Sequence, residues 1–186
     1  MLEVMASMVA RIVRFWLPAI CIFAGFNPFS SPQSQLKVGY ALLNADTGNV
    51  VPVGSALFSY TNSEGVLICQ AGVAAAEPIS SGRIFVDEAG AHTGIAIANP
   101  SQQDATVTLT LRDATGSEVK QTNIKLAAGK HLPTFIYQLF SDLSSTFTGS
   151  LTFESTQKLA AITLRQTLNA LGEPLYTTLP VVDLSA

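Results

Sequence analysis

The stretch Ala105–Arg112 reads Ala-Thr-Val-Thr-Leu-Thr-Leu-Arg, and it decides the fold class. Large apolar residues at Val107, Leu109 and Leu111 alternate in it with three threonines and an arginine. Successive side chains of a strand point to opposite faces, so the alternation predicts a strand with one buried face and one face in water. The threonines form a ladder on the face in water.

Nine further runs of the chain have the same character, and turn clusters separate them. The runs are Val38–Leu43, Ser55–Tyr60, Val66–Gln70, Arg83–Val86, Gly94–Ala98, Val119–Leu126, Ser150–Glu154, Leu159–Arg165 and Leu175–Val182. The turn clusters are Asp46–Asn49, Asn62–Gly65, Asp87–Gly90, Asp113–Gly116 and Asn169–Gly172. Gly, Asn and Asp suit turns because they tolerate positive φ or bond to their own backbone. About ten short strands at this spacing predict an all-β, antiparallel sandwich or barrel.

One segment breaks the alternation and predicts a short helix. Five apolar residues would share one face of it: Phe135, Ile136, Leu139, Phe140 and Leu143. Thr134 is the expected N-cap, and Pro133 before it suits a helix start. The helix would plug one end of the sandwich or cross between its sheets.

An internal repeat predicts two related halves. Gly54-Ser55-Ala56-Leu57-Phe58 recurs as Gly149-Ser150-Leu151-Thr152-Phe153, and Glu77-Pro78 recurs as Glu173-Pro174. The expected halves are residues 37–90 and 91–186 of one domain, 37–186, with a shared core. If the copies are equivalent, Gly54–Asp87 and Gly149–Asp183 follow the same strand–hairpin–strand path, with Phe58 and Phe153 equally buried. The second copy's extra residue would lie in the Asn169–Gly172 loop.

The core itself is also predicted from the alternation. We expect one common core to contain the inward residues of two strands, Val107, Leu109, Leu111, Ile162 and Leu164.

A resemblance follows from this strand and turn texture. Residues Thr93–Pro100, Val107–Leu111, Gly149–Leu151 and Ala160–Arg165 look like Ig-like sandwich modules of bacterial secreted and surface proteins. The resemblance implies an Ig-like antiparallel β-sandwich of about ten strands and an extracellular or envelope location. It carries over no functional residue, because such modules commonly serve as spacers or adhesive units.

The first 36 residues differ from the rest and predict export. Arg11 and Arg14 precede an unbroken apolar run from Phe15 to Phe26, and a Pro/Ser-rich segment follows. This order is typical of a secretory signal peptide, with removal expected before about Leu36. The apolar run is shorter than the ~20 residues that span a bilayer. An uncleaved membrane anchor is the alternative, as is a true start at Met8.

The charge and cysteine content exclude several classes of protein. A net charge of −3 without a Lys/Arg cluster argues against binding to nucleic acid, which requires a positive patch. If the signal segment is removed, Cys21 leaves with it, and Cys69 has no partner for an intrachain disulfide.

Four motifs resemble catalytic or metal-binding patterns, and each has a simpler interpretation. Asp46-Thr47-Gly48 matches the aspartic protease triplet but is explained by a hairpin turn. Ser117-x-x-Lys120 and Ser155-x-x-Lys158 match the S-x-x-K pattern but lie at strand edges without its companion motifs. Asp87, Glu88 and His92 could gather around a metal but lack the spacing of zinc or calcium ligands, so an exposed polar turn is the favoured interpretation.

The sequence therefore predicts a non-catalytic, exported structural or adhesive module, with no catalytic, cofactor or metal-binding residues. The alternatives are a carbohydrate-binding module and, less favoured, a cryptic hydrolase. The candidates for sugar stacking are four tyrosines, Tyr40, Tyr60, Tyr137 and Tyr176. Expected partners are other domains, surface proteins or glycans.

Overall fold

The computed structural model describes residues 9–10, 39–43 and 53–185 and is nearly all antiparallel β-structure. Its strands are β1 (Val9–Ala10), β2 (Ser55–Thr61), β3 (Leu67–Ala74), β4 (Ile79–Asp87), β5 (His92–Ala98), β6 (Ala105–Asp113), β7 (Glu118–Leu126), β8 (His131–Phe135), β9 (Thr148–Leu168), β10 (Pro174–Thr177) and β11 (Val182–Asp183). One helix, α1, spans Ile136–Leu139.

The long strand β9 belongs to two layers of sheet. Its first part, up to Ser155, pairs with β4 on one side and β6 on the other. From Ala160 onward it pairs with β5 and β10 instead. We call β11-β4-β9-β6-β7 the β4 layer and β10-β9-β5-β8 the β5 layer. Strand β9 therefore ties the two layers together covalently.

The apolar core lies between these layers. Its fully buried side chains include Ile84, Val107, Leu109, Leu151 and Phe153 from the β4 layer. Ile95 and Ile97 of β5 enter the same cluster from the β5 layer. The core is thus built from the inward faces of both layers.

The inner face predicted for Ala105–Arg112 is confirmed in β6, but the face predicted to lie in water is wrong for Thr110, which is buried. Val107, Leu109 and Leu111 have no exposed surface, and Thr106 is exposed on the other face. The threonine ladder also bonds to its neighbours, since Thr108 Oγ1 donates to Asn123 Oδ1 at 2.8 Å.

The core prediction is wrong for the second part of β9. Ala161 and Thr163 point into the core there, whereas Ile162 and Leu164 lie half-buried on the opposite face. Thr163 is accommodated inside because its Oγ1 donates to the Leu179 carbonyl at 2.6 Å. The prediction assumed that the larger side chains face the core. It fails here because this part of β9 is partly covered on both faces.

Three hairpins close with the same turn, which the sequence predicted. In Asp113–Gly116 the glycine N–H donates to the aspartate carbonyl at 3.0 Å, and the glycine has φ +87°. The aspartate Oδ1 accepts the N–H groups of Thr115 at 2.9 Å and Ser117 at 3.0 Å. Asn62–Gly65 and Asn169–Gly172 repeat these bonds. A type I turn followed by a left-handed glycine fixes the register of each hairpin.

The expected helix exists but is shorter and begins later. Thr134 and Pro133 belong to β8, which stays extended because Phe135 still pairs with Gly94 of β5. The side chain of Gln138, not that of Thr134, caps the helix, since its Oε1 accepts the Phe135 N–H at 3.0 Å.

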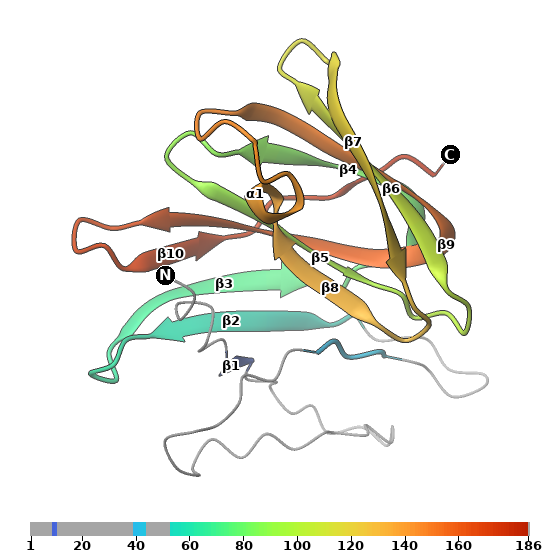
Figure 1. Ribbon diagram of the computed structural model, residues 1–186. Helices are drawn as coiled ribbons and strands as arrows, with labels where there is room; N and C mark the ends of the chain where they lie inside the picture. Colours follow the sequence, from blue (N-terminus) through green and yellow to red (C-terminus); the bar gives the residue numbers. More distant parts are fainter. Residues whose placement is uncertain (1–8, 11–38, 44–52, 186) are drawn as a thin grey trace, which may run out of the picture.

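The apolar face predicted for this segment is confirmed in part. Phe135, Ile136 and Phe140 are buried, and Leu139 and Leu143 pack partly against the core. In Figure 1 the helix lies beside β8 and β5, at one end of the layers.

The predicted equivalence of the two repeat copies is wrong. Gly54–Asp87 forms the hairpin of β2 and β3 and then β4, whereas the runs Ser150–Glu154 and Leu159–Arg165 join into β9. Phe153 is fully buried, and Phe58 is only half-buried. The loop Asn169–Gly172 is the turn between β9 and β10, as expected.

Two other predicted strands also differ. Residues 39–43 of the run Val38–Leu43 form no strand. The run Leu175–Val182 is divided into β10 and β11, because Pro180 between them has no N–H to donate to a neighbouring strand.

The hairpin of β2 and β3 belongs to neither layer but packs against β10 of the β5 layer. It forms a separate sheet in which Val9 and Ala10 of β1 pair with Ser59 and Phe58 of β2. Figure 1 shows the hairpin (teal) beside β10, which its strand β3 contacts.

Candidate functional site

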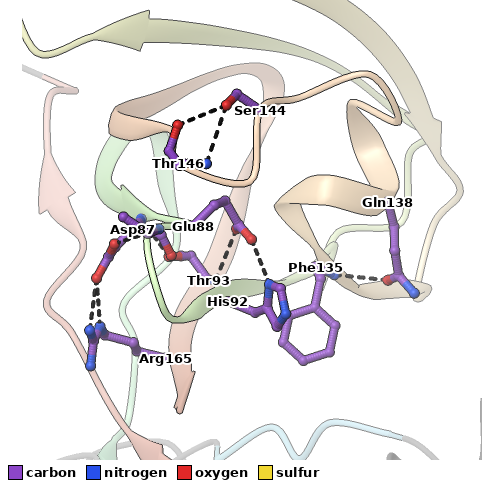
Figure 2. Close-up of polar contacts among 10 residues, drawn as sticks. Asp87, Glu88, His92, Thr93, Phe135, Gln138, Ser144, Thr146 and Arg165 are labelled. Atoms are coloured by element: carbon purple, nitrogen blue, oxygen red, sulfur yellow. Dashed lines mark hydrogen bonds and ion pairs between the residues drawn. The ribbon is translucent and has the colours of Figure 1, made fainter. Parts of the chain in front are cut away.

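A buried carboxylate lies in the turn between β4 and β5. Glu88 is 4% exposed, and its main-chain N–H donates to the Phe147 carbonyl at 2.8 Å. Its Oε1 accepts the N–H of Thr93 at 3.1 Å, and its Oε2 lies 2.7 Å from His92 Nδ1. Figure 2 shows both contacts. A buried charge is expensive unless it is paired and hydrogen-bonded, and both oxygens of Glu88 have partners.

Glu88 fixes the orientation of the His92 ring. A carboxylate only accepts hydrogen bonds, so Nδ1 of the imidazole is the donor. The histidine side chain is 52% exposed, whereas that of the glutamate is 2% exposed. Glu88 therefore holds Nδ1 of an imidazole whose side chain remains half-exposed.

Two aromatic rings from the end of β8 and from α1 adjoin this imidazole. The ring of Tyr137 lies 4.9 Å from that of His92, tilted by 60°. Phe135 stacks on Tyr137 at 5.4 Å with an interplanar angle of 14°. Phe135 is buried and Tyr137 is 39% exposed, so the stack offers one accessible ring beside the imidazole.

Asp87, next to the buried glutamate, has a different partner. Its Oδ2 accepts hydrogen bonds from Nε of Arg165 at 3.1 Å and from Nη2 at 2.7 Å. Its main-chain N–H donates to Thr93 Oγ1 at 2.9 Å. Because Asp87 ends β4 and Arg165 lies in the second part of β9, this ion pair links the two layers (Figure 2).

The predicted exposed turn at this loop is therefore wrong for Glu88, which is buried. The structure does bring Glu88 and His92 together, but Asp87 faces Arg165. Across residues 9–10, 39–43 and 53–185, no group of three or more His, Cys, Asp or Glu side chains is placed to hold a metal ion. In the same part of the chain, no hydroxyl or thiol hydrogen-bonds to His92.

The other predicted motifs lie elsewhere. Ser155-x-x-Lys158 lies within β9, and Ser117-x-x-Lys120 runs from a turn into β7, so neither serine begins a helix. The triplet Asp46-Thr47-Gly48, Cys21 and the segment Arg11–Phe26 lie outside the described residues. His131 begins β8, and its ring meets that of Tyr40 edge-on at 6.0 Å.

The four tyrosines do not form one row. Tyr60 and Tyr176 meet edge-on at 6.4 Å beside β3, while Tyr40 and Tyr137 occupy two other places. Burial raises the pKa of Tyr176 to about 12, with smaller effects of Cys69 and Tyr60. Of these four tyrosines, Tyr137 is the one whose ring lies against His92, the partner of the buried Glu88.

Sequence reasoning found the turn but not the burial of Glu88. An Asp-x-x-Gly turn can be read from four residues. The main-chain N–H of Glu88 donates to the carbonyl of Phe147, which is far away in sequence, so part of what holds this turn in place comes from a distant segment. No local pattern carries that information.

No helix in the part of the chain that the structure describes is long and apolar enough to cross a membrane.

Comparisons with known proteins give a fold and no activity. No family model matches the chain, and no curated protein matches its sequence. The crystal structure of Thermotoga maritima 1070 is similar, with a TM-score of 0.51 and 13% sequence identity. The match covers 59% of this chain and 98% of that one. At this identity the likeness concerns the fold alone, so the chain shares an all-β architecture with that protein.

Proposed function

We propose that this protein is a non-catalytic, exported module with an Ig-like antiparallel β-sandwich that serves a structural or adhesive role. Strand β9 carries the proposal, because it pairs with β4 and β6 in one layer and with β5 and β10 in the other. A strand that crosses between layers makes the core a single mechanical unit. Such a unit suits a spacer or a scaffold that presents loops to partners.

The surface supports the same role. On the outer face of the β4 layer a row of side chains runs from Arg83 through Thr152 and Thr110 to Gln121 and is joined by hydrogen bonds, with Arg83 Nε donating to Thr152 Oγ1 at 3.1 Å and Gln121 Nε2 to Thr110 Oγ1 at 3.1 Å. Only 12% of residues are charged. A surface made of hydroxyls and amides relies on hydrogen bonds rather than on charge, as expected of an exported β-protein.

Export is tested by mass spectrometry of the protein recovered from outside the producing cells. We expect a new N-terminus before about Leu36. Replacement of Arg11 and Arg14 by Glu should leave the product inside the cell, because the positive residues before the apolar run are lost. An intact Met1 on a cytosolic product would contradict export.

The adhesive role is tested with beads coated with the exported protein. They should bind to envelopes of the producing cells, and beads coated with the heat-unfolded chain should not. Equal binding of both kinds of bead would count against an adhesive surface formed by the fold.

Carbohydrate binding is a second candidate, favoured by the exposed ring of Tyr137. Its stacking on Phe135 and the Glu88–His92 pair would hold it rigidly for a sugar ring. Affinity electrophoresis in soluble glucans, xylans and chitin oligomers would measure this. Tyr137→Ala should abolish any retardation, whereas Tyr40→Ala is the matched control, since Tyr40 is similarly exposed (41%) but lies elsewhere. Equal retardation of the two variants would exclude this ring as the site.

A further inference from the structure

The contact between Glu88 and His92 joins a buried carboxylate to a half-exposed imidazole (Figure 2). Taking a carboxylate out of water is expensive, and replacing a buried charge pair by apolar residues of similar size is often neutral or stabilising. The glutamate side chain is 2% exposed, whereas the imidazole is 52% exposed, so water screens the interaction from one side. Stability alone therefore does not explain a glutamate at this position. The contact does fix the imidazole ring.

The contact also decides which nitrogen of the imidazole carries the proton. Nδ1 lies 2.7 Å from Oε2 of Glu88, and a carboxylate only accepts hydrogen bonds. In the neutral imidazole the other nitrogen, Nε2, is then a hydrogen-bond acceptor. Within the part of the chain that the structure describes, Nε2 has no hydrogen-bond partner. His92 therefore offers one acceptor in an imposed orientation.

This oriented imidazole lies beside an exposed aromatic ring. The ring centroids of Tyr137 and His92 are 4.9 Å apart, and the rings are tilted by 60°. Phe135, which is buried, stacks on Tyr137 at 5.4 Å, and Tyr137 remains 39% exposed. An apolar surface with a few fixed polar groups is the usual composition of a small-ligand site.

A pyranose sugar matches this combination, because one face of its ring carries C–H groups and its edge carries hydroxyls. The C–H face stacks on an aromatic ring, and a hydroxyl donates to the imidazole. The charges of the cluster favour a neutral sugar over an acidic one. Glu88 and Asp87 are both carboxylates, and Arg165, the cation in contact with them, is already bound to Asp87 at 2.7 Å. An anionic sugar would meet negative charge without an unpaired cation among these residues.

We propose that His92 is the specificity-determining residue of a neutral-sugar site at Tyr137, and that the buried Glu88 is its positioning residue. The inference rests on the carbohydrate-binding function proposed above, to which it adds the class of sugar and the polar contact. Tyr137 supplies the stacking surface, and Nε2 of His92 accepts a hydrogen bond from a sugar hydroxyl. Glu88 does not touch the sugar but holds the imidazole in the orientation and tautomer that this bond requires.

The binding test is affinity electrophoresis of the full chain in the neutral glycans named above, with polygalacturonate as an acidic probe. Only a neutral glycan should retard the parent chain. The double variant Glu88→Met/His92→Phe replaces the pair by apolar residues, so that no unpaired carboxylate is left inside the protein. It keeps a ring beside Tyr137 and should bind about tenfold more weakly, which corresponds to about 1.4 kcal/mol for one lost hydrogen bond.

The matched control is His131→Phe. The ring of His131 also meets a tyrosine, Tyr40, edge-on at 6.0 Å. Among the described residues no carboxylate forms an ion pair with His131. This variant should bind glycans as the parent chain does.

The positioning role of Glu88 is measured without any ligand, by nitrogen NMR of the imidazole ring. In the parent chain the proton of neutral His92 should reside on Nδ1. Glu88→Gln should give a mixture of the two tautomers, because an amide donates hydrogen bonds as well as accepting them. It should also weaken glycan binding, since only part of the imidazole population then has Nε2 as an acceptor.

The possible outcomes distinguish this inference from the carbohydrate-binding function on which it rests. A parent chain that no glycan retards overturns both. If Tyr137→Ala abolishes retardation but the double variant binds like the parent, the sugar site stands and the role of His92 is overturned. Equal weakening by His131→Phe also overturns that role. Stronger retardation in polygalacturonate overturns the neutral class of sugar, and an unchanged tautomer in Glu88→Gln overturns the role of Glu88.

Discussion

Arg165 donates two hydrogen bonds, at 3.1 and 2.7 Å, to the same carboxylate oxygen of Asp87. The side chains are 31% and 14% exposed, so water screens the pair incompletely. Asp87 ends β4 and Arg165 belongs to the part of β9 that pairs with β5. The contact therefore joins the two layers at the turn that also holds Glu88.

Arg165→Gln should destabilise the protein by about 1–3 kcal/mol, because hydrogen bonds to a charged group are lost and Asp87 is left partly buried. Urea unfolding would measure the change. Arg112→Gln is the control, since Arg112 and Glu118 form an exposed pair at 3.7 Å, worth at most about 1 kcal/mol. If the two variants lose the same free energy of unfolding, the Arg165–Asp87 pair stabilises the protein no more than an exposed ion pair does.

Leu109→Ala should cost roughly 2–5 kcal/mol, because it leaves a cavity in the fully buried core. Thr108→Ala on the opposite face of β6 should cost far less, losing only its bond to Asn123. Urea midpoints of both variants decide the assignment of faces. Similar midpoints would refute it.

Gly149→Ala should be strongly destabilising, because its methyl group would lie 2.1 Å from the carbonyl oxygen of Arg112 in the neighbouring strand. The backbone of β6 or β9 would have to move. Gly72→Ala is the matched control in β3, where a methyl group meets nothing within 4 Å. We expect it to be neutral or to stabilise by about 0.4–1 kcal/mol through the unfolded chain. Thermal unfolding of the two variants compares them directly, and a harmless Gly149→Ala would contradict the close approach of the strands.

Thr115→Ala should raise the pKa of Asp113 toward its ordinary value of 3.8. The Thr115 hydroxyl is the main group that lowers this pKa, followed by main-chain N–H groups of the turn. Because the pKa of Asp113 is lower in the folded protein, its ionised carboxylate stabilises the folded state at any pH above the ordinary pKa of 3.8. This stabilisation is lost as the pH falls through the folded-state pKa. Titration of the carboxyl carbon by NMR would measure both proteins. Thr115→Ser keeps the hydroxyl and should keep the low pKa, and an identical pKa in all three proteins would exclude the hydroxyl as the cause.

Features that depend on neighbouring residues could be predicted from the sequence, whereas contacts between segments far apart in the chain could not. The inner face of Ala105–Arg112 and three of the Asx–Gly turns depend on neighbouring residues, and these predictions are confirmed. The face of Ile162 was predicted wrongly, because a strand with cover on both sides does not reveal its inner face by side-chain size. The buried Thr163 could not be anticipated, since its partner is the main chain of Leu179.

The repeat failed for a related reason. Similar residues at Gly54–Phe58 and Gly149–Phe153 specify a strand start, but not the path of the chain beyond it. Asn62–Gly65 folds the first copy back into a hairpin, and the second copy has no Asn-x-x-Gly turn at the matching place, so β9 continues. Of the candidate site, the turn was predicted, and the inward glutamate and its aromatic neighbours were not.

The position of β9 late in the chain also governs when the protein can fold. Strand β4 pairs only with β9 and β11, and β5 and β6 each lack one neighbour until β9 is present. Ribosomal synthesis delivers β9 after eight other strands, so neither layer can be completed on the nascent chain before Thr148 has been added. Pairings between such distant residues are slow to form, because a long loop must close before any contact rewards it. The two layers therefore close late, after local hairpins such as β2–β3 and β6–β7 have already been synthesised.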